Sequence, residues 1–117
     1  MTQINELHTQ AVQLLQQLIA IPSFSREENM TADVIEKLLK EKGIQTHRKM
    51  NNIWAWNKYF DASKPTILLN SHHDTVKPNS GYTRDPFDAK IEDGKLYGLG
   101  SNDAGGPLVS LIAVFTC

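Results

Sequence analysis

An α/β fold is predicted for this chain, and two patterns carry the prediction. Residues 2–20 and 25–43 place apolar side chains three and four positions apart, which is the spacing of amphipathic helices. Residues 44–69 contain short alternating or apolar runs that are separated by turn-forming residues. Because helices that alternate with strands bury each other's apolar faces, the expected architecture is an α/β sandwich.

The two N-terminal helices are expected to be scaffold without chemistry. The first should end at Ile21-Pro22, because the residue before a proline avoids helical angles. In the second, Ser25 and Glu28 match a capping box, and Gly43 is expected just past the helix end. The expected apolar stripes are Ile4, Leu7, Ala11, Leu14, Leu15 and Leu18 in the first helix, and Val34, Ile35, Leu38 and Leu39 in the second.

Three strands and a hairpin are expected next. The strands are predicted at residues 44–49, 53–56 and 66–69. The third is almost continuously apolar, which is typical of a strand buried on both faces. Residues 90–97, with Asp93-Gly94 at their centre, predict a tight hairpin.

A glycine-rich turn, residues 98–106, leads into an apolar run at residues 108–115. The run predicts a helix that is apolar on all sides, and such a helix needs cover on most of its surface. A short protein with a buried C-terminal helix is one interpretation. We favour the other, that the chain is part of a longer polypeptide.

Composition excludes several function classes. The 117 residues are 40% hydrophobic and 21% charged, with a net charge of −1. This charge favours neither nucleic acid nor an anionic membrane as a partner. No apolar stretch reaches the ~20 residues that span a bilayer, and the N-terminus lacks the apolar core of a signal peptide. With a single cysteine, Cys117, no internal disulfide can form, and we expect a cytosolic protein.

His72 and Asp74 form the first candidate site, directly after the third predicted strand. In extended backbone, side chains two positions apart project to the same side, so His73 should point the other way, to the surface or a pocket rim. A histidine nitrogen can bind a divalent metal while a carboxylate accepts the other ring N–H. The alternative is an ordinary surface pair.

Asp103 is the second candidate, framed by glycines in the turn at residues 98–106. A dinucleotide-binding loop would need a glycine at this position, and the aspartate charge would oppose a pyrophosphate. A carboxylate in a tight glycine turn suits a cation better, since it can bridge two metal ions. The alternative is that Asp103 caps the helix that begins near Gly105.

Taken together, these motifs resemble the M20 family of metallopeptidases and deacylases. The resemblance covers the whole chain and includes the start of the family's N-terminal region at residues 18–23. The family's acetylornithine deacetylases, enzymes of arginine biosynthesis, and its succinyl-diaminopimelate desuccinylases are the members it resembles most. The motifs, in order, are His72-x-Asp74, Asp85-Pro86-Phe87, Asp93-Gly94-Lys95-Leu96-Tyr97-Gly98 and Asp103-Ala104-Gly105-Gly106.

The resemblance implies a fold and residue roles. Residues 1–117 would be the N-terminal portion of a catalytic domain, a three-layer α/β sandwich of the zinc-peptidase type. His72 would be a metal ligand, Asp103 would bridge two zinc ions (cobalt in some members), and Asp74 would be an active-site residue that orients His72. The peptide bond after Asp103 would be a candidate for the cis form. The substrate would be an N-acyl amino acid or a short peptide, and the intact protein a homodimer.

Other parts of such an enzyme have no counterpart in these residues. The family's general base belongs to a Glu-Glu pair that follows the bridging aspartate, whereas the only such pair here, Glu27-Glu28, precedes it. The remaining ligands, the base and the lid and dimerisation domain are therefore expected outside this sequence, and the chain alone is expected to be inactive. Departures from the family pattern leave the acyl group and the amine side open; they lie at Ser71, Leu99, Ala104 and Pro107.

Four functions therefore compete. The leading one is the N-terminal part of a dinuclear metal-dependent amide hydrolase that removes an acyl group from an N-acyl amino acid such as N-acetylornithine. A dipeptidase or carboxypeptidase of the same family is the nearest alternative. A degenerate, non-catalytic binding module and a nucleotide-binding domain are the others, and Asp103 disfavours the last.

Overall fold

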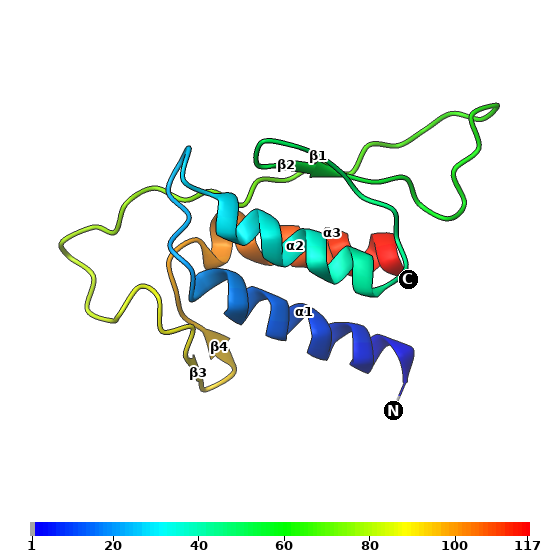
Figure 1. The fold of residues 1–117 in the computed structure, drawn as a ribbon. Coiled ribbons are helices and arrows are strands. Elements are labelled where there is room, and N and C mark those ends of the chain that lie inside the picture. The colour runs from blue at the N-terminus through cyan, green and yellow to red at the C-terminus, as the bar shows by residue number, and fades with distance from the viewer. Residues whose placement is uncertain (1) are drawn as a thin grey trace.

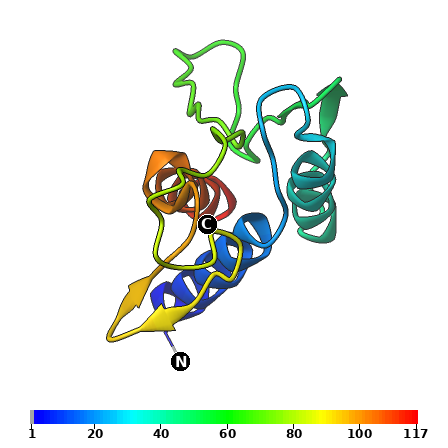
Figure 2. The same ribbon diagram turned by 90° about the vertical axis from the view of Figure 1, so that its left-hand side faces the viewer.

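The computed structural model describes residues 2–117, which form three helices and two small hairpins. The helices are α1 (Gln3–Ile19), α2 (Asn29–Glu41) and α3 (Gly106–Thr116). The strands are β1 (His47–Lys49), β2 (Asn52–Trp54), β3 (Ile91–Glu92) and β4 (Lys95–Leu96). Helix α1 lies between α2 and α3, and the β1–β2 hairpin covers α2 on the side away from α1 (Figures 1 and 2).

Helix α1 confirms the first predicted helix. Thr2 is its N-cap, and the Thr2 side chain accepts a hydrogen bond of 3.3 Å from the Asn5 N–H. The helix gives way at Ala20, just before the Ile21-Pro22 pair. Ile4, expected on the apolar face, is exposed on the first turn.

Helix α2 confirms the second helix but not its predicted start. It begins at Asn29, and no side chain caps its first turn, so the capping box is wrong. The Glu28 carboxylate instead accepts hydrogen bonds of 2.8 Å from the Arg26 N–H and from Asn51 Nδ2. Gly43 ends the helix as expected. Its φ of +74° and the bond from the Ile44 N–H to the Leu39 carbonyl form a Schellman motif.

Both sheets are two-stranded and antiparallel. In β1–β2, His47 lies opposite Trp54 and Lys49 opposite Asn52. The β3–β4 hairpin confirms the turn predicted at Asp93-Gly94, where both residues have positive φ, as a tight two-residue turn requires. Residues 2–117 are thus mixed α and β.

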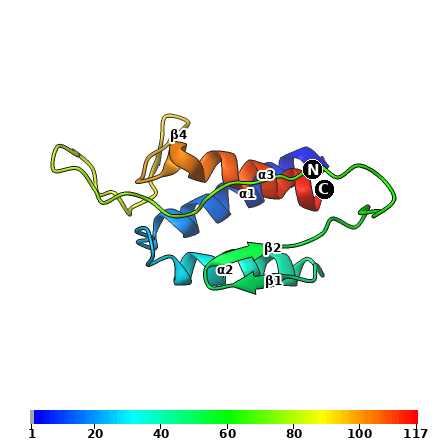
Figure 3. The same ribbon diagram turned by 90° about the horizontal axis from the view of Figure 1, so that it is seen from above.

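The strand predicted at residues 66–69 does not form within the described chain. Ile67 and Leu68 are 85% and 83% exposed, and no backbone–backbone hydrogen bond involves residues 65–71. A strand buried on both faces needs neighbours along its edges and layers above and below it. Within residues 2–117, β1 and β2 pair only with each other, and the connection from β2 toward β3 crosses α3 and α1 in the view of Figure 3 without forming a strand.

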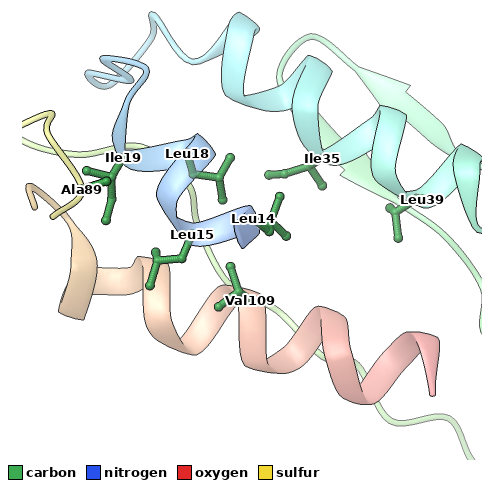
Figure 4. Packing of buried hydrophobic residues seen from close by; sticks show 8 residues of the cluster. All are labelled: Leu14, Leu15, Leu18, Ile19, Ile35, Leu39, Ala89 and Val109. Atoms are coloured by element: carbon green, nitrogen blue, oxygen red, sulfur yellow. The ribbon is translucent and has the colours of Figure 1, made fainter. Parts of the chain in front are cut away.

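The hydrophobic core lies where the three helices meet. Figure 4 shows side chains of α1 pointing toward α2 on one side and toward α3 on the other. The cluster consists of Leu14, Leu15, Leu18, Ile19, Ile35, Leu39, Ala89 and Val109. In α3 only Val109 is fully buried, and Val114 is exposed. Within residues 2–117, no helix has the length and apolar character that a bilayer crossing demands.

Candidate metal site

The α1–α2 connection holds the segment that carries His72 and Asp74. The Thr75 N–H donates to the Ser23 carbonyl at 2.8 Å, and Phe24 and Thr75 form an isolated parallel bridge. The buried Ser23 hydroxyl donates to the His73 carbonyl at 2.9 Å. The segment is therefore held by backbone and side-chain hydrogen bonds to the connection that follows α1.

The glycine-rich turn packs directly on α1 and places Asp103. An irregular helical turn, η1 (Ser101–Gly105), precedes α3. A side chain at Gly105 would meet the Leu15 Cδ1 atom at 2.6 Å, and one at Gly98 would collide with the Ile19 Cγ2 atom. Only glycine permits this close approach. The Asp103–Ala104 peptide bond is cis, which confirms the expectation for that bond.

The structure brings all three predicted site residues together. His72 Nε2 lies 3.0 Å from Asp103 Oδ1, and His72 Nδ1 lies 3.1 Å from Asp74 Oδ1. The Asp74 backbone carbonyl is also within 3.2 Å of His72 Nδ1. Asp103 does not cap α3, whose N-cap is Gly105 without a side-chain hydrogen bond, so that alternative is wrong. The histidine ring therefore lies between two carboxylates that come from the two separate motifs.

His73 points away from this pair, as its alternation with His72 predicts, and it also acts as an anchor. Its Nδ1 lies 2.8 Å from the hydroxyl of the buried Thr31, and its Nε2 lies 2.9 Å from the Asn51 carbonyl. Because the carbonyl can only accept, Nε2 carries a proton and donates it. His73 thus ties the site segment to α2 and to the β1–β2 turn.

Ser25 is a site residue that the sequence analysis missed. Its hydroxyl donates a hydrogen bond to Asp74 Oδ2, the carboxylate oxygen that His72 does not use. The capping-box pattern assigned Ser25 to the start of α2, and no local signal connects it to a residue 49 positions away. Only the folded chain reveals this contact.

The electrostatics of the site favour a charged pair. Burial alone would lower the pKa of His72, but hydrogen bonds to the Asp74 carbonyl and to Asp103, with the charges of both carboxylates, raise it above 6.5. The hydrogen bond from Ser25 and the charge of His72 outweigh burial and lower the pKa of Asp74. Since the His72 side chain is half exposed and that of Asp103 90% exposed, water screens much of this attraction.

A pH titration should reveal the raised pKa of His72. A raised pKa means that protonated His72 stabilises the fold. This stabilisation is complete at pH values below the pKa of His72 in the unfolded chain. It is lost as the pH rises through the higher pKa that His72 has in the folded chain. Following the His72 Cε1–H resonance, we expect a midpoint above 6.5 that moves down in Asp103→Asn. A wild-type midpoint below 6.5, or one that Asp103→Asn leaves in place, would contradict this account.

The donor set suits zinc or cobalt but is incomplete. An imidazole nitrogen and a carboxylate oxygen converge from His72 and Asp103, and both are common ligands of zinc. A cation there would take the place of the hydrogen bond between them. Within residues 2–117, no group of three or more histidine, cysteine or acidic side chains could hold a metal ion. These two side chains alone are therefore too few to form a complete metal site.

The chain is similar in sequence to a known protein family and to several known enzymes. Residues 68–117 match the model of peptidase family M20/M25/M40. The succinyl-diaminopimelate desuccinylase of Beijerinckia indica subsp. indica is 32% identical over 114 residues, covering 88% of this chain and 29% of the relative. The succinyl-diaminopimelate desuccinylase of Rickettsia bellii is 32% identical over 109 residues, covering 85% of this chain and 27% of the relative.

A relative with another activity matches as well. The Beta-Ala-Xaa dipeptidase of Lactobacillus delbrueckii subsp. lactis is 36% identical over 106 residues, covering 80% of this chain and 22% of the relative. The chain therefore spans less than a third of the length of each of these three relatives.

Proposed function

This chain belongs to peptidase family M20/M25/M40, and we propose that it is the N-terminal portion of the catalytic domain of a dinuclear, metal-dependent amide hydrolase. The observation that carries the proposal is the 3.0 Å contact between His72 Nε2 and Asp103 Oδ1. It joins two motifs that are 31 residues apart and leaves each side chain exposed enough to meet a cation.

Each of the three residues has a proposed role. His72 would be a ligand of one metal ion, and Asp103 would be a ligand shared by that ion and a second one. Asp74 is the active-site carboxylate that accepts the Nδ1 proton of His72, which orients the ring and raises its basicity as a ligand. The bound cations, zinc or alternatively cobalt, would supply the Lewis acid for hydrolysis.

An N-acyl amino acid is the proposed substrate. The relatives from Beijerinckia and Rickettsia are named for removal of a succinyl group from diaminopimelate, and they support a deacylase. The Lactobacillus relative, named as a dipeptidase, supports a short peptide as the second candidate. None of these three names supports the narrower expectation of acetylornithine and arginine biosynthesis.

We make further proposals for a longer polypeptide that would contain this chain. We propose that residues 66–69, which make no backbone–backbone hydrogen bond here, become a strand of a three-layer sandwich when further polypeptide supplies the neighbouring strands. Their exposed apolar side chains would then be covered. A homodimer formed through another domain, and action in the cytosol without a nucleic-acid or membrane partner, are our expectations for that protein.

The 117-residue chain alone should not hydrolyse amides. Residues 104–117 contain no acidic side chain that could serve as the base. Glu28, of the one Glu-Glu pair, is held by Arg26 and Asn51 in the α1–α2 connection. We expect no zinc-dependent release of amine from N-succinyl-diaminopimelate, N-acetylornithine or a β-alanyl dipeptide. Metal-dependent turnover that His72→Ala abolishes would contradict this prediction.

The protein encoded by the complete reading frame tests the function itself. If codon 117 is followed by an open frame that encodes a Glu-Glu pair and a late histidine, its product should hydrolyse an N-acyl amino acid with zinc. Asp103→Ala and His72→Ala should each abolish this activity, whereas His8→Ala, at an exposed position of α1, should not. A frame that closes at codon 117 would instead favour a non-catalytic binding module.

A further inference from the structure

We propose that Ser25 is a positioning residue, which holds the Asp74 carboxylate so that His72 presents Nε2 to Asp103. The inference rests on the proposed function for its metal, but the contacts that carry it belong to this chain. Ser25 hydrogen-bonds to Asp74, which in turn contacts His72, so its effect is transmitted through Asp74.

The Asp74 carboxylate is shared between two partners. The Ser25 hydroxyl donates to Oδ2, and His72 Nδ1 lies 3.1 Å from Oδ1. A free aspartate side chain can rotate about its terminal torsion, which would exchange the two oxygens or turn both away. A donor on Oδ2 selects the orientation in which Oδ1 faces the ring. Because this carboxylate oxygen can only accept a hydrogen bond, His72 carries a proton on Nδ1, which sets its tautomer.

The backbone is held in place on both sides of Asp74. His73 is fixed by Thr31 and Asn51, and its carbonyl accepts from Ser23. The Thr75 N–H is bound to the same Ser23. Because the neighbours of Asp74 are held in this way, the freedom that remains lies in the Asp74 side chain itself, and Ser25 restricts that freedom.

Position 25 can make the contact because of its place in the chain. The bridge between Phe24 and Thr75 sets the α1–α2 connection beside the site segment, so the residue after Phe24 lies next to Asp74. Ser25 is exposed, and its backbone belongs neither to α1 nor to α2. Replacing it should therefore remove one hydroxyl without disturbing the core.

The experiment compares four proteins: the wild-type chain, Ser25→Ala, Ser25→Thr and Ser63→Ala. Ser63→Ala is a matched control, because the Ser63 hydroxyl also donates to an aspartate, Asp61, at 2.7 Å in a distant exposed loop. Two quantities are measured on each chain. One is the rate at which the His72 Nδ1 proton exchanges with water, read by 15N nuclear magnetic resonance without metal. The other is the affinity for Co²⁺, read by titration.

In Ser25→Ala the Nδ1 proton should exchange about five-fold faster, the effect of losing one supporting hydrogen bond. Its Co²⁺ affinity should fall about five- to ten-fold, somewhat less than the 10–100-fold typical of a direct partner of a metal ligand. Ser25→Thr keeps the hydroxyl, so its proton exchange rate and its Co²⁺ affinity should both stay within about two-fold of wild type. The same is expected of Ser63→Ala.

Unchanged exchange in Ser25→Ala, or Ser25→Thr behaving like Ser25→Ala, would overturn the positioning role. Failure of the proposed function would be seen in the Co²⁺ affinity of another variant, His72→Ala. If His72→Ala leaves Co²⁺ affinity unaltered, the metal assignment is wrong, while the metal-free exchange rates still decide the role of Ser25.

Discussion

Replacing Leu14 with alanine is expected to lower the free energy of unfolding by about 3 kcal/mol, within the range measured for buried leucines. Leu14 is 3% exposed and lies in the centre of the core, where α1 meets α2 and α3 (Figure 4). The truncation removes apolar contacts and leaves a cavity that three packed helices can close only in part. Since domains of this size have about 5–15 kcal/mol of stability in total, the loss is large.

Urea unfolding monitored by circular dichroism measures this change. Ile4→Ala is the matched control, because Ile4 lies on the same helix but is 77% exposed, and it should cost no more than about 0.5 kcal/mol. Equal losses in the two variants would mean that the three-helix core is not the main source of stability.

Gly105→Ala is the second substitution with a large expected effect, because it forces a side chain into the contact between η1 and α1. The new Cβ would lie 2.6 Å from Leu15 Cδ1 and 2.8 Å from the Gly100 carbonyl oxygen. The leucine can rotate, but the carbonyl belongs to the backbone of the same turn. We expect a loss of about 1–3 kcal/mol, as in other overpacked positions, and displacement of Asp103 from His72.

Unfolding experiments and the His72 ring resonances follow these two effects separately. Gly81→Ala serves as the comparison, since a Cβ there meets only the Asn79 Oδ1 atom, at 3.2 Å, in an exposed loop. Stability and His72 resonances that stay unchanged in Gly105→Ala would show that the turn does not depend on its contact with α1.

Much of the fold could be predicted because its signals are local. The apolar stripes of α1 and α2, the glycine after α2 and the Asp93-Gly94 turn depend on neighbours within a few residues. Residues 66–69 were predicted wrongly because a strand depends on partners along its edges. The apolar pattern records the preference of these residues for burial, but the described chain contains no sheet that could receive them.

Some features of the site could also be predicted from local sequence, whereas others depend on contacts between distant residues. His72 and Asp74 share one side because alternation is local, and the glycines around Asp103 mark a tight turn. Their convergence could be inferred only from the resemblance to a family. The anchors could not be predicted, since Ser25 and Thr31 contact the site segment across 49 and 42 residues. A serine hydroxyl has the same local signature whether it caps a helix or binds a distant carboxylate.

A calorimetric titration of Zn²⁺ into the 117-residue chain, His72→Ala, Asp103→Ala and His8→Ala tests the central claim most directly. We predict one weak site in the wild type, well short of the about 10–16 kcal/mol of structural zinc sites, because only two ligands converge. Binding should disappear in His72→Ala and in Asp103→Ala, and should persist in His8→Ala, the exposed histidine of α1. Two tight sites in the wild type, or zinc binding that persists in His72→Ala or in Asp103→Ala, would contradict the assignment of these residues as part of a dinuclear metal centre.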